Sequence, residues 1–137
     1  MKQRLSFGYI SIIADNIVEI TVDEGVEISL EMIEESQCFL DSQLSNSFSM
    51  LINQVNDYTY SYEAQLSVAS HENLVAVAFV YFSDFSKRVS ETLNARRVHD
   101  NLNTKIFSGL ELGWQEAMTW LTDEMNIAAK SVCSYDL

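Results

Sequence analysis

Five hydroxyl-bearing side chains stand in a row at Tyr58–Tyr62, where the sequence reads YTYSY. They follow a strand-like run at Phe48–Val55, and neighbouring residues add carboxamides and a carboxylate. Such groups can hold a small molecule or a protein partner, because tyrosine combines a flat apolar ring with a polar tip. The candidates for ligand or partner binding are Asn53, Asn56, Asp57, Tyr58, Thr59, Tyr60, Ser61 and Tyr62.

The same run also has a purely structural interpretation as the start of a helix. Ser61 is a good N-cap, Glu63 complements the helix dipole, and the tyrosines can bury their rings while their hydroxyls reach solvent. A phosphate on Ser61 or Thr59 would lie at a helix N-terminus, where negative charge is favoured. Asp57, Glu63 and the overall acidity work against it. From the sequence, all of these interpretations stay open.

Other reactive side chains are sparse. His71 lies near the end of a predicted helix and His99 in a predicted loop, and neither has a metal ligand at suitable spacing. The chain has no nucleophile elbow, glycine-rich phosphate loop or dinucleotide fingerprint. We therefore expect no metal, no cofactor and no enzymatic activity. An enzyme could use only Asp57, Glu63, His71 and the tyrosines.

Two basic pairs and two tryptophans are further candidates for surface contacts. Lys87-Arg88 and Arg96-Arg97 are expected on the solvated face and at the end of a helix, or as a local basic spot. Trp114 fits an apolar helical stripe with Leu110, Ala117 and Leu121, which is expected to face the core. Trp120, six positions later, cannot share that face and is expected to be partly exposed, for example at an interface.

The composition describes a soluble, acidic, single-domain protein. Its 137 residues are 47% hydrophobic and carry a net charge of -12. That charge repels nucleic acids and anionic membranes and suits a partner with a basic face. No signal peptide or membrane-spanning run is predicted, so we expect a cytoplasmic protein with Cys38 and Cys133 reduced. One domain is expected over residues 1–137, with a core at about 7–124 and a loose tail at 125–137.

Hydrophobic periodicity predicts strands alternating with helices after an opening hairpin. The predicted strands are Phe7–Ala14, Ile17–Val22, Phe48–Val55, Leu74–Phe82 and Thr104–Phe107. The predicted helices cover about 30–44, 62–70, 84–93 and 110–121. The second of them is expected to pack Leu66 and Ala69 inward. Their expected N-caps are Ser29, Ser61, Ser83 or Asp84, and Ser108 in a capping box with Glu111.

This order predicts an α/β fold with a mixed, mostly parallel sheet flanked by helices. The continuously apolar run Leu74–Phe82 is typical of a strand covered on both faces, in the middle of such a sheet. Tyr58–Tyr62 would then lie at the carboxyl rim, where open sheets bind ligands. The opening strand, Phe7–Ala14, is expected at a sheet edge, where its apolarity predicts a homodimer.

The order and spacing of these elements resemble the STAS superfamily, and most of all the SpoIIAA-like (STAS/SEC14-like) bacterial proteins. The resemblance covers about residues 7–121. It is carried by the segments VEISLEMIEE, INQVNDY, AVAFVYFSDFSKRVSETL and KIFSGLELGWQEAMTWL. It implies a regulatory module that binds a protein partner, with a phosphorylated residue at Ser61 or Thr59. The SEC14-like label implies, as an alternative, a small apolar or lipid-like ligand.

Overall fold

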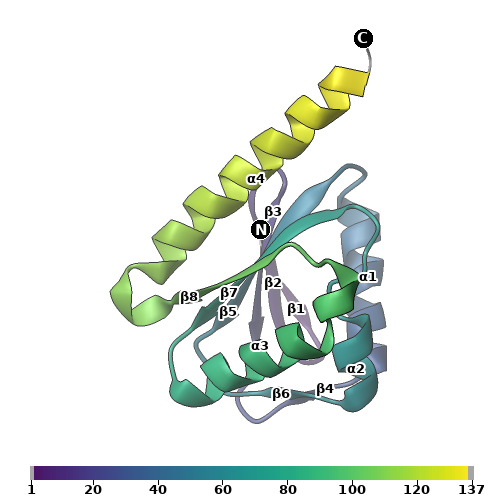
Figure 1. Cartoon of the computed structure of the whole chain (residues 1–137). Helices are drawn as coiled ribbons and strands as arrows, with labels where there is room; N and C mark the ends of the chain where they lie inside the picture. The colour runs from purple at the N-terminus through teal and green to yellow at the C-terminus, as the bar shows by residue number, and fades with distance from the viewer. Residues whose placement is uncertain (1, 136–137) are drawn as a thin grey trace.

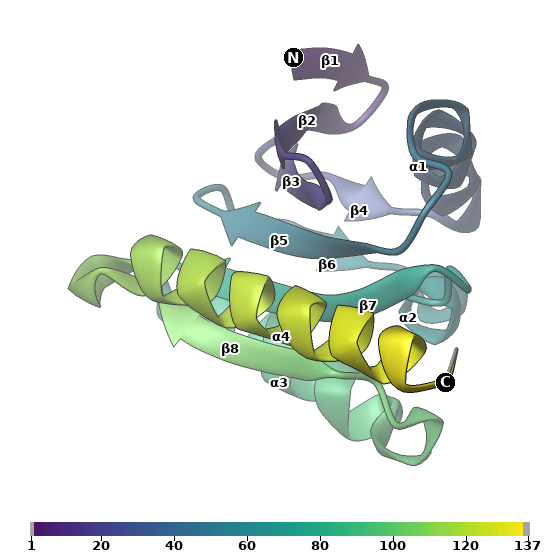
Figure 2. The same cartoon turned by 90° about the horizontal axis from the view of Figure 1, so that it is seen from above.

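The computed structural model describes residues 2–135, with side chains as far as residue 130, around one six-stranded sheet. Strands follow one another across this sheet in the order β1-β2-β3-β5-β7-β8 (Figures 1 and 2). A second, two-stranded sheet pairs β4 with β6 in parallel. The strands are β1 (Lys2–Leu5), β2 (Gly8–Ala14), β3 (Ile17–Val22), β4 (Glu27–Ile28), β5 (Phe48–Gln54), β6 (Thr59–Tyr60), β7 (Leu74–Tyr81) and β8 (Thr104–Ser108).

The large sheet is mixed and mostly parallel, as predicted. β1, β2 and β3 pair antiparallel, whereas β3, β5, β7 and β8 are all parallel. Parallel strands end at the same edge of a sheet, so these four strands share one carboxyl rim. The YTYSY run follows β5 at this rim, which confirms its predicted position.

Helices cover both faces of the sheet (Figure 2). α1 (Leu30–Gln43), α2 (Tyr62–Ser67) and α3 (Asp84–Arg96) lie on one face, and α4 (Gly113–Tyr135) crosses the other. β7 belongs to both apolar layers, because Val77 and Phe79 face α1–α3 while Ala78 and Val80 face α4. This two-sided burial explains why the β7 segment is apolar almost throughout.

The prediction that the opening hairpin strand lies at a sheet edge is wrong. β1 pairs with β2 from Lys2 opposite Ser11 to Leu5 opposite Gly8, and β1 is the edge strand. Most of β1 is exposed and it carries Lys2 and Arg4, which discourage edge-to-edge pairing. The argument for a homodimer from an uncovered apolar strand therefore fails.

Two expectations about the last helix also change. The Ser108 side chain makes no capping hydrogen bond, and a 3₁₀ turn at Gly109–Glu111 precedes a left-handed residue, Leu112, before α4 begins. Leu110, predicted to face the core, is 76% exposed. The predicted loose tail is helical as far as Tyr135, although Met125 is the last buried side chain among those described, which reach residue 130. Residues 136–137 of that tail lie outside the described residues.

Within residues 2–135, no helix combines the length and apolarity needed to cross a bilayer.

Candidate functional site

The polar residues before the YTYSY run fasten the loops at the carboxyl rim. The Asn53 side chain donates to the Glu19 carboxylate (3.1 Å), and the Asn56 side chain donates to the Val22 carbonyl (3.0 Å). Asp57 Oδ1 accepts from Ser83 Oγ at 2.7 Å and from Ser86 Oγ at 3.0 Å. These contacts tie β5 to β3 and to the start of α3. The side chains of Asn53, Asn56 and Asp57 are therefore already engaged in hydrogen bonds within the protein.

Tyr58 and Tyr60 point inward, contrary to the prediction that their hydroxyls reach solvent. They are 3% and 8% exposed, because Tyr58 directly precedes the short strand β6 and alternates with Thr59, so its side chain lies on the same, buried side as that of Tyr60. Their hydroxyl oxygens lie 2.8 Å apart and their rings meet edge to face, with centroids 5.3 Å apart. Burial raises the pKa of Tyr58 to about 12 and that of Tyr60 well above its ordinary value. Both hydroxyls are therefore neutral near pH 7.

A buried polar chain leads to this pair from α3. Ser90 Oγ donates to Gln54 Oε1 at 2.9 Å, and both side chains are at most 1% exposed. Gln54 Nε2 is buried and makes no hydrogen bond of ordinary geometry. Gln54 also lowers the pKa of the Tyr58 hydroxyl, against the larger effect of burial. The chain thus runs Ser90, Gln54, Tyr58, Tyr60.

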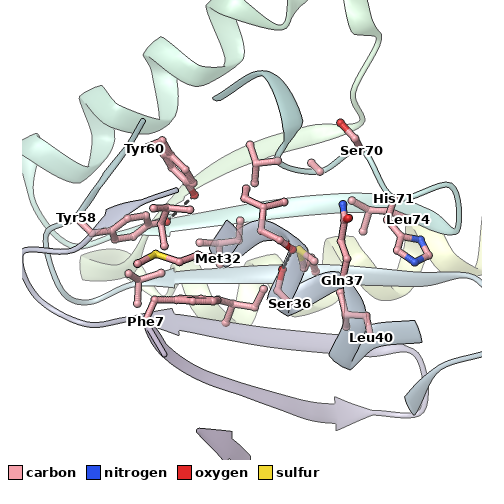
Figure 3. Close-up of a pocket in the computed structure, with 18 residues that line it drawn as sticks. Phe7, Met32, Ser36, Gln37, Leu40, Tyr58, Tyr60, Ser70, His71 and Leu74 are labelled. Atoms are coloured by element: carbon pink, nitrogen blue, oxygen red, sulfur yellow. Dashed lines mark hydrogen bonds between the residues drawn. The ribbon is translucent and has the colours of Figure 1, made fainter. Parts of the chain in front are cut away.

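The two hydroxyls lie at one end of an apolar cavity between the sheet and α1 (Figure 3). Its walls come from Phe7, from β3–β5 and from α1, and two methionines, Met32 and Met50, supply adaptable surface. At the other end, Ser70 and Gln37 reach the surface between α1 and the segment that follows α2. The cavity is therefore apolar along its length and polar at both ends.

His71 closes that outer end. Its Nδ1 accepts from the Asn73 amide (3.0 Å), so Nε2 carries the proton and donates to Asp41 Oδ1 at 2.6 Å. Its ring also packs edge-on against Phe48, with centroids 5.0 Å apart. This pair of contacts links α1 to the segment between α2 and β7. Opening the cavity would require the link between His71 and Asp41 to break.

The cavity is small in this closed state. Its volume is about 50 Å³, enough for about four water-sized positions at ~10–15 Å³ each. An empty apolar void of that size costs about 1 kcal/mol of folding free energy. A molecule of about four non-hydrogen atoms fits, whereas a lipid chain does not.

The outward side of the same run borders an open groove between α2 and α3. Thr59, Gln65, Val89 and Arg88 line this groove of about 380 Å³. Phe85 stands at its edge and is 47% exposed. Two further apolar side chains on α2 face solvent nearby: Tyr62 (62% exposed) and Leu66 (48% exposed, although predicted to pack inward). We give the name α2–α3 surface to five of these residues: Tyr62, Leu66, Phe85, Arg88 and Val89.

Cations gather along α3 beside this surface. The Arg96 guanidinium lies 5.7 Å from the Tyr62 ring centre, and Lys87 Nζ lies 5.6 Å from that of Tyr81. No carboxylate among residues 2–135 forms an ion pair with Arg88. Arg97, by contrast, is 5% exposed, so the expectation that it belongs to a solvated face is wrong.

Trp114 and Trp120 are both half-buried against the α4-side core. Trp114 Nε1 donates to Glu19 Oε2 at 2.8 Å, and the Trp120 ring packs on Phe107 at 6.1 Å between centroids. Partial exposure of Trp120 is therefore confirmed. The buried part of its ring packs on the same apolar layer as Trp114.

Ser61 is the N-cap of α2, as predicted, since its Oγ accepts from the Ala64 amide at 3.2 Å. We expect Ser61→Ala to lower the free energy of unfolding by about 1 kcal/mol, because that amide loses its partner. Ser61→Asp keeps an acceptor in place and should stay within about 0.5 kcal/mol of the wild type. Urea denaturation measures both; equal stability of all three proteins would contradict the capping role. Phosphorylation of Ser61 or Thr59 stays a prediction.

Several functional candidates escaped the sequence analysis. Gln54 shares the alternation of Phe48, Met50 and Ile52, so a polar side chain at a buried strand position was a visible signal. The exposed aromatic Phe85 carried no such signal, because its spacing with Val89 is that of an ordinary core stripe.

Comparison with protein-family models, with curated proteins and with solved structures finds no match. Among the described residues, no three His, Cys, Asp or Glu side chains are grouped so that they could hold a metal ion.

Proposed function

We propose that this chain is a non-enzymatic, cytoplasmic regulatory module of the SpoIIAA-like, STAS type that binds a protein partner through the α2–α3 surface. The observation that carries the proposal is the exposure of three apolar side chains on the contacting helices α2 and α3: Tyr62 and Leu66 on α2, and Phe85 at the edge of the groove. Aromatic side chains and arginine are enriched where proteins bind one another. Exposed apolar side chains clustered around a groove are typical of an interaction site.

The residues that would contact the partner differ from those first selected. Tyr60 lines the groove from beneath and contacts the buried Tyr58, whereas Asn53, Asn56 and Asp57 hold the supporting loops. Tyr62 and Thr59 keep a direct role. The guanidinium of Arg88 suits a partner that places a carboxylate beside its apolar anchor.

Affinity purification with matched baits tests the proposal. We expect the wild-type protein to retain a partner from native lysate. The double variant that carries both Tyr62→Ser and Phe85→Ser should lose that partner. With the purified partner, Phe85→Ser should weaken binding by at least about tenfold, because an anchor side chain is removed. Ile127→Ser is the control, since Ile127 is 57% exposed on α4, away from the groove.

If the double variant retains the partner as well as the wild type does, the proposed surface is wrong. No retention above an unrelated bait would overturn partner binding altogether. If the retained partner is a second copy of this chain, light scattering will show a dimer that the double variant abolishes.

A second candidate function is the binding of a small apolar ligand, and the cavity behind Tyr58 and Tyr60 favours it. A cavity with apolar walls and a few polar groups that fix orientation is the usual form of a small-molecule site. The volume of about 50 Å³ limits the ligand in the closed state to a few atoms. A lipid-like ligand would need α1 and α2 to part at His71.

A further inference from the structure

The short strand β6 has one free edge, and this edge faces the groove between α2 and α3. Its other edge pairs with β4, where the Thr59 amide donates to the Val26 carbonyl at 2.9 Å. The Ser61 amide donates to the Ile28 carbonyl of β4 at 2.8 Å. Backbone groups alternate between the two edges of a strand, so the N–H and C=O of Tyr60 point away from β4. Among residues 2–135 this small sheet has no third strand.

Helix α3 forms the opposite wall of the groove. Its groove residues lie at helical spacing and share one face of the helix: Phe85, Arg88, Val89 and Thr92. Tyr60 lies across the groove from them. Figure 1 shows β6 and α3 on the same side of the large sheet, opposite α4. The volume of about 380 Å³ leaves room for a few extended residues between β6 and α3.

The side chain of Gln65 occupies the free edge of β6 without satisfying its own hydrogen-bonding groups. Its Nε2 donates to the Tyr60 carbonyl at 3.2 Å, as the amide of an added strand would. Its Oε1 is buried and has no hydrogen-bond partner in the described part of the chain, which is unfavourable for a polar atom. The Tyr60 N–H likewise has no acceptor there. The free edge therefore lacks the groups that a neighbouring strand supplies.

Arg88 gives the groove a local positive charge on an acidic protein. None of the described carboxylates forms an ion pair with its guanidinium, and the residues that line the groove include no carboxylate. Lys87 and Arg96 are two further cations on α3. The net charge of the whole chain is -12, so acidic segments are repelled by most of its surface. A carboxylate is therefore favoured specifically beside Arg88.

We propose that the partner adds an extended segment to the free edge of β6 and places an Asp or Glu side chain on Arg88. The inference rests on the proposed function, because it uses the α2–α3 surface. A carbonyl of the segment accepts from the Tyr60 N–H, and an amide of the segment replaces the Gln65 side chain on the Tyr60 carbonyl. Such strand addition takes its affinity from backbone hydrogen bonds and its specificity from alternate side chains.

A phage library of random linear decapeptides is the probe, selected on the wild-type protein with Phe85→Ser as the negative bait. We expect peptides retained only by the wild type to carry an Asp or Glu at a fixed place in an alternating, β-branched sequence. A synthetic copy of the best peptide is titrated by NMR. Arg88→Gln should weaken its binding about fivefold. Lys87→Gln is the matched control, since Lys87 lies over Tyr81 outside the groove, and should change binding less than twofold.

Methylation of single peptide nitrogens tests the strand pairing directly, because it removes one N–H and leaves every side chain unchanged. We expect one position to weaken binding about fivefold, for one lost hydrogen bond. The positions on either side of it should change binding less than twofold, since neighbouring amides of a strand point to opposite edges. Gln65→Ala should bind the peptide at least as tightly as the wild type, because the competing side-chain amide is gone.

The possible failures are distinguishable. Selected peptides that carry no acidic residue, or that tolerate methylation at every nitrogen, would overturn strand addition and leave the α2–α3 surface in place. Weaker binding by Gln65→Ala would show that its side chain is a contact rather than a competitor, and would also overturn the inference. If no peptide is selected but the lysate partner depends on Tyr62 and Phe85, the inference falls and the proposed function stands. If neither a peptide nor a partner is retained, both fall.

Discussion

Replacing Arg97 by methionine should lower the free energy of unfolding by about 3 kcal/mol, one of the largest effects expected of any side chain here. The Arg97 guanidinium donates to the carbonyls of Gln65 (2.9 Å) and Val68 (2.6 Å), and to Ser70 Oγ (3.0 Å). It also pairs with Asp100. The two carbonyls belong to the end of α2, where no later amide of the helix can satisfy them.

The size of this effect follows from what the substitution leaves behind. Methionine fills much of the same volume, so packing is largely kept, but the α2 carbonyls lose a charged donor worth about 1.5–3 kcal/mol. Asp100 contributes little to the loss, because its side chain is 52% exposed and water replaces its partner. Lysine has the charge but not the planar fork, so Arg97→Lys should recover less than half of the lost stability.

Arg96→Met is the matched control, since Arg96 precedes Arg97 but lies exposed over Tyr62. We expect it to change stability by less than about 0.5 kcal/mol. Urea denaturation of the three variants against wild type measures the differences. A loss for Arg97→Met no larger than that for Arg96→Met would show that the end of α2 does not depend on the guanidinium.

The elements that the sequence predicted are those whose signal is local. β2, β3, β5 and β7 are runs of β-branched and aromatic residues bounded by turn residues, and Ser29, Ser61 and Ser83 each act as the expected N-cap. β1 escaped because KQRL is short, charged and paired only along one side. β4 and β6 escaped because two residues show no period, and their pairing joins positions 32 residues apart.

The position of the candidate site was predictable, but which of its side chains are buried and which face solvent was not. Chain order alone placed YTYSY after a parallel strand, and hence at the carboxyl rim. Reading the run as a helix start missed that Tyr58 and Tyr60 alternate with Thr59, as in a strand with one buried side. That alternation separates a hidden tyrosine pair from an exposed Tyr62, and so separates a cavity from a docking surface.

The burial of Arg97 could not be predicted from the sequence for a different reason. Its neighbours Gln65, Val68 and Ser70 lie about one helix and one strand earlier in the chain, and no spacing rule connects them to it. Two adjacent arginines look equivalent in a sequence. Only the packing of α3 against α2 decides that one stacks on a tyrosine in solvent while the other caps a helix.

The second large effect is expected for Gly113→Ala, which should lower the free energy of unfolding by about 3 kcal/mol or more. A Cβ at Gly113 would lie 2.0 Å from the Ser108 carbonyl oxygen and 2.4 Å from its carbon. Both are backbone atoms at the end of β8, so no side chain can move aside. Either the strand end or the first turn of α4 would have to shift.

Gly25→Ala is the control for the loss of glycine itself. Gly25 has a φ of 78° but nothing within 4 Å of an added Cβ, so only conformational strain of about 1 kcal/mol is expected. Thermal and urea unfolding of the two variants compare steric overlap with strain. Equal losses would mean that α4 can start elsewhere at little cost.

The helix start should respond differently one residue earlier. Leu112 is left-handed, with a φ of 62°, and 70% exposed, so it strains the backbone and buries almost no surface. Leu112→Gly should therefore cost nothing, even though it also changes the residue that joins the turn to α4. Suppose that Gly113→Ala lowers the free energy of unfolding and Leu112→Gly does not. The geometry of this junction is then fixed by the close approach of Gly113 to the Ser108 backbone, and not by the left-handed turn at Leu112.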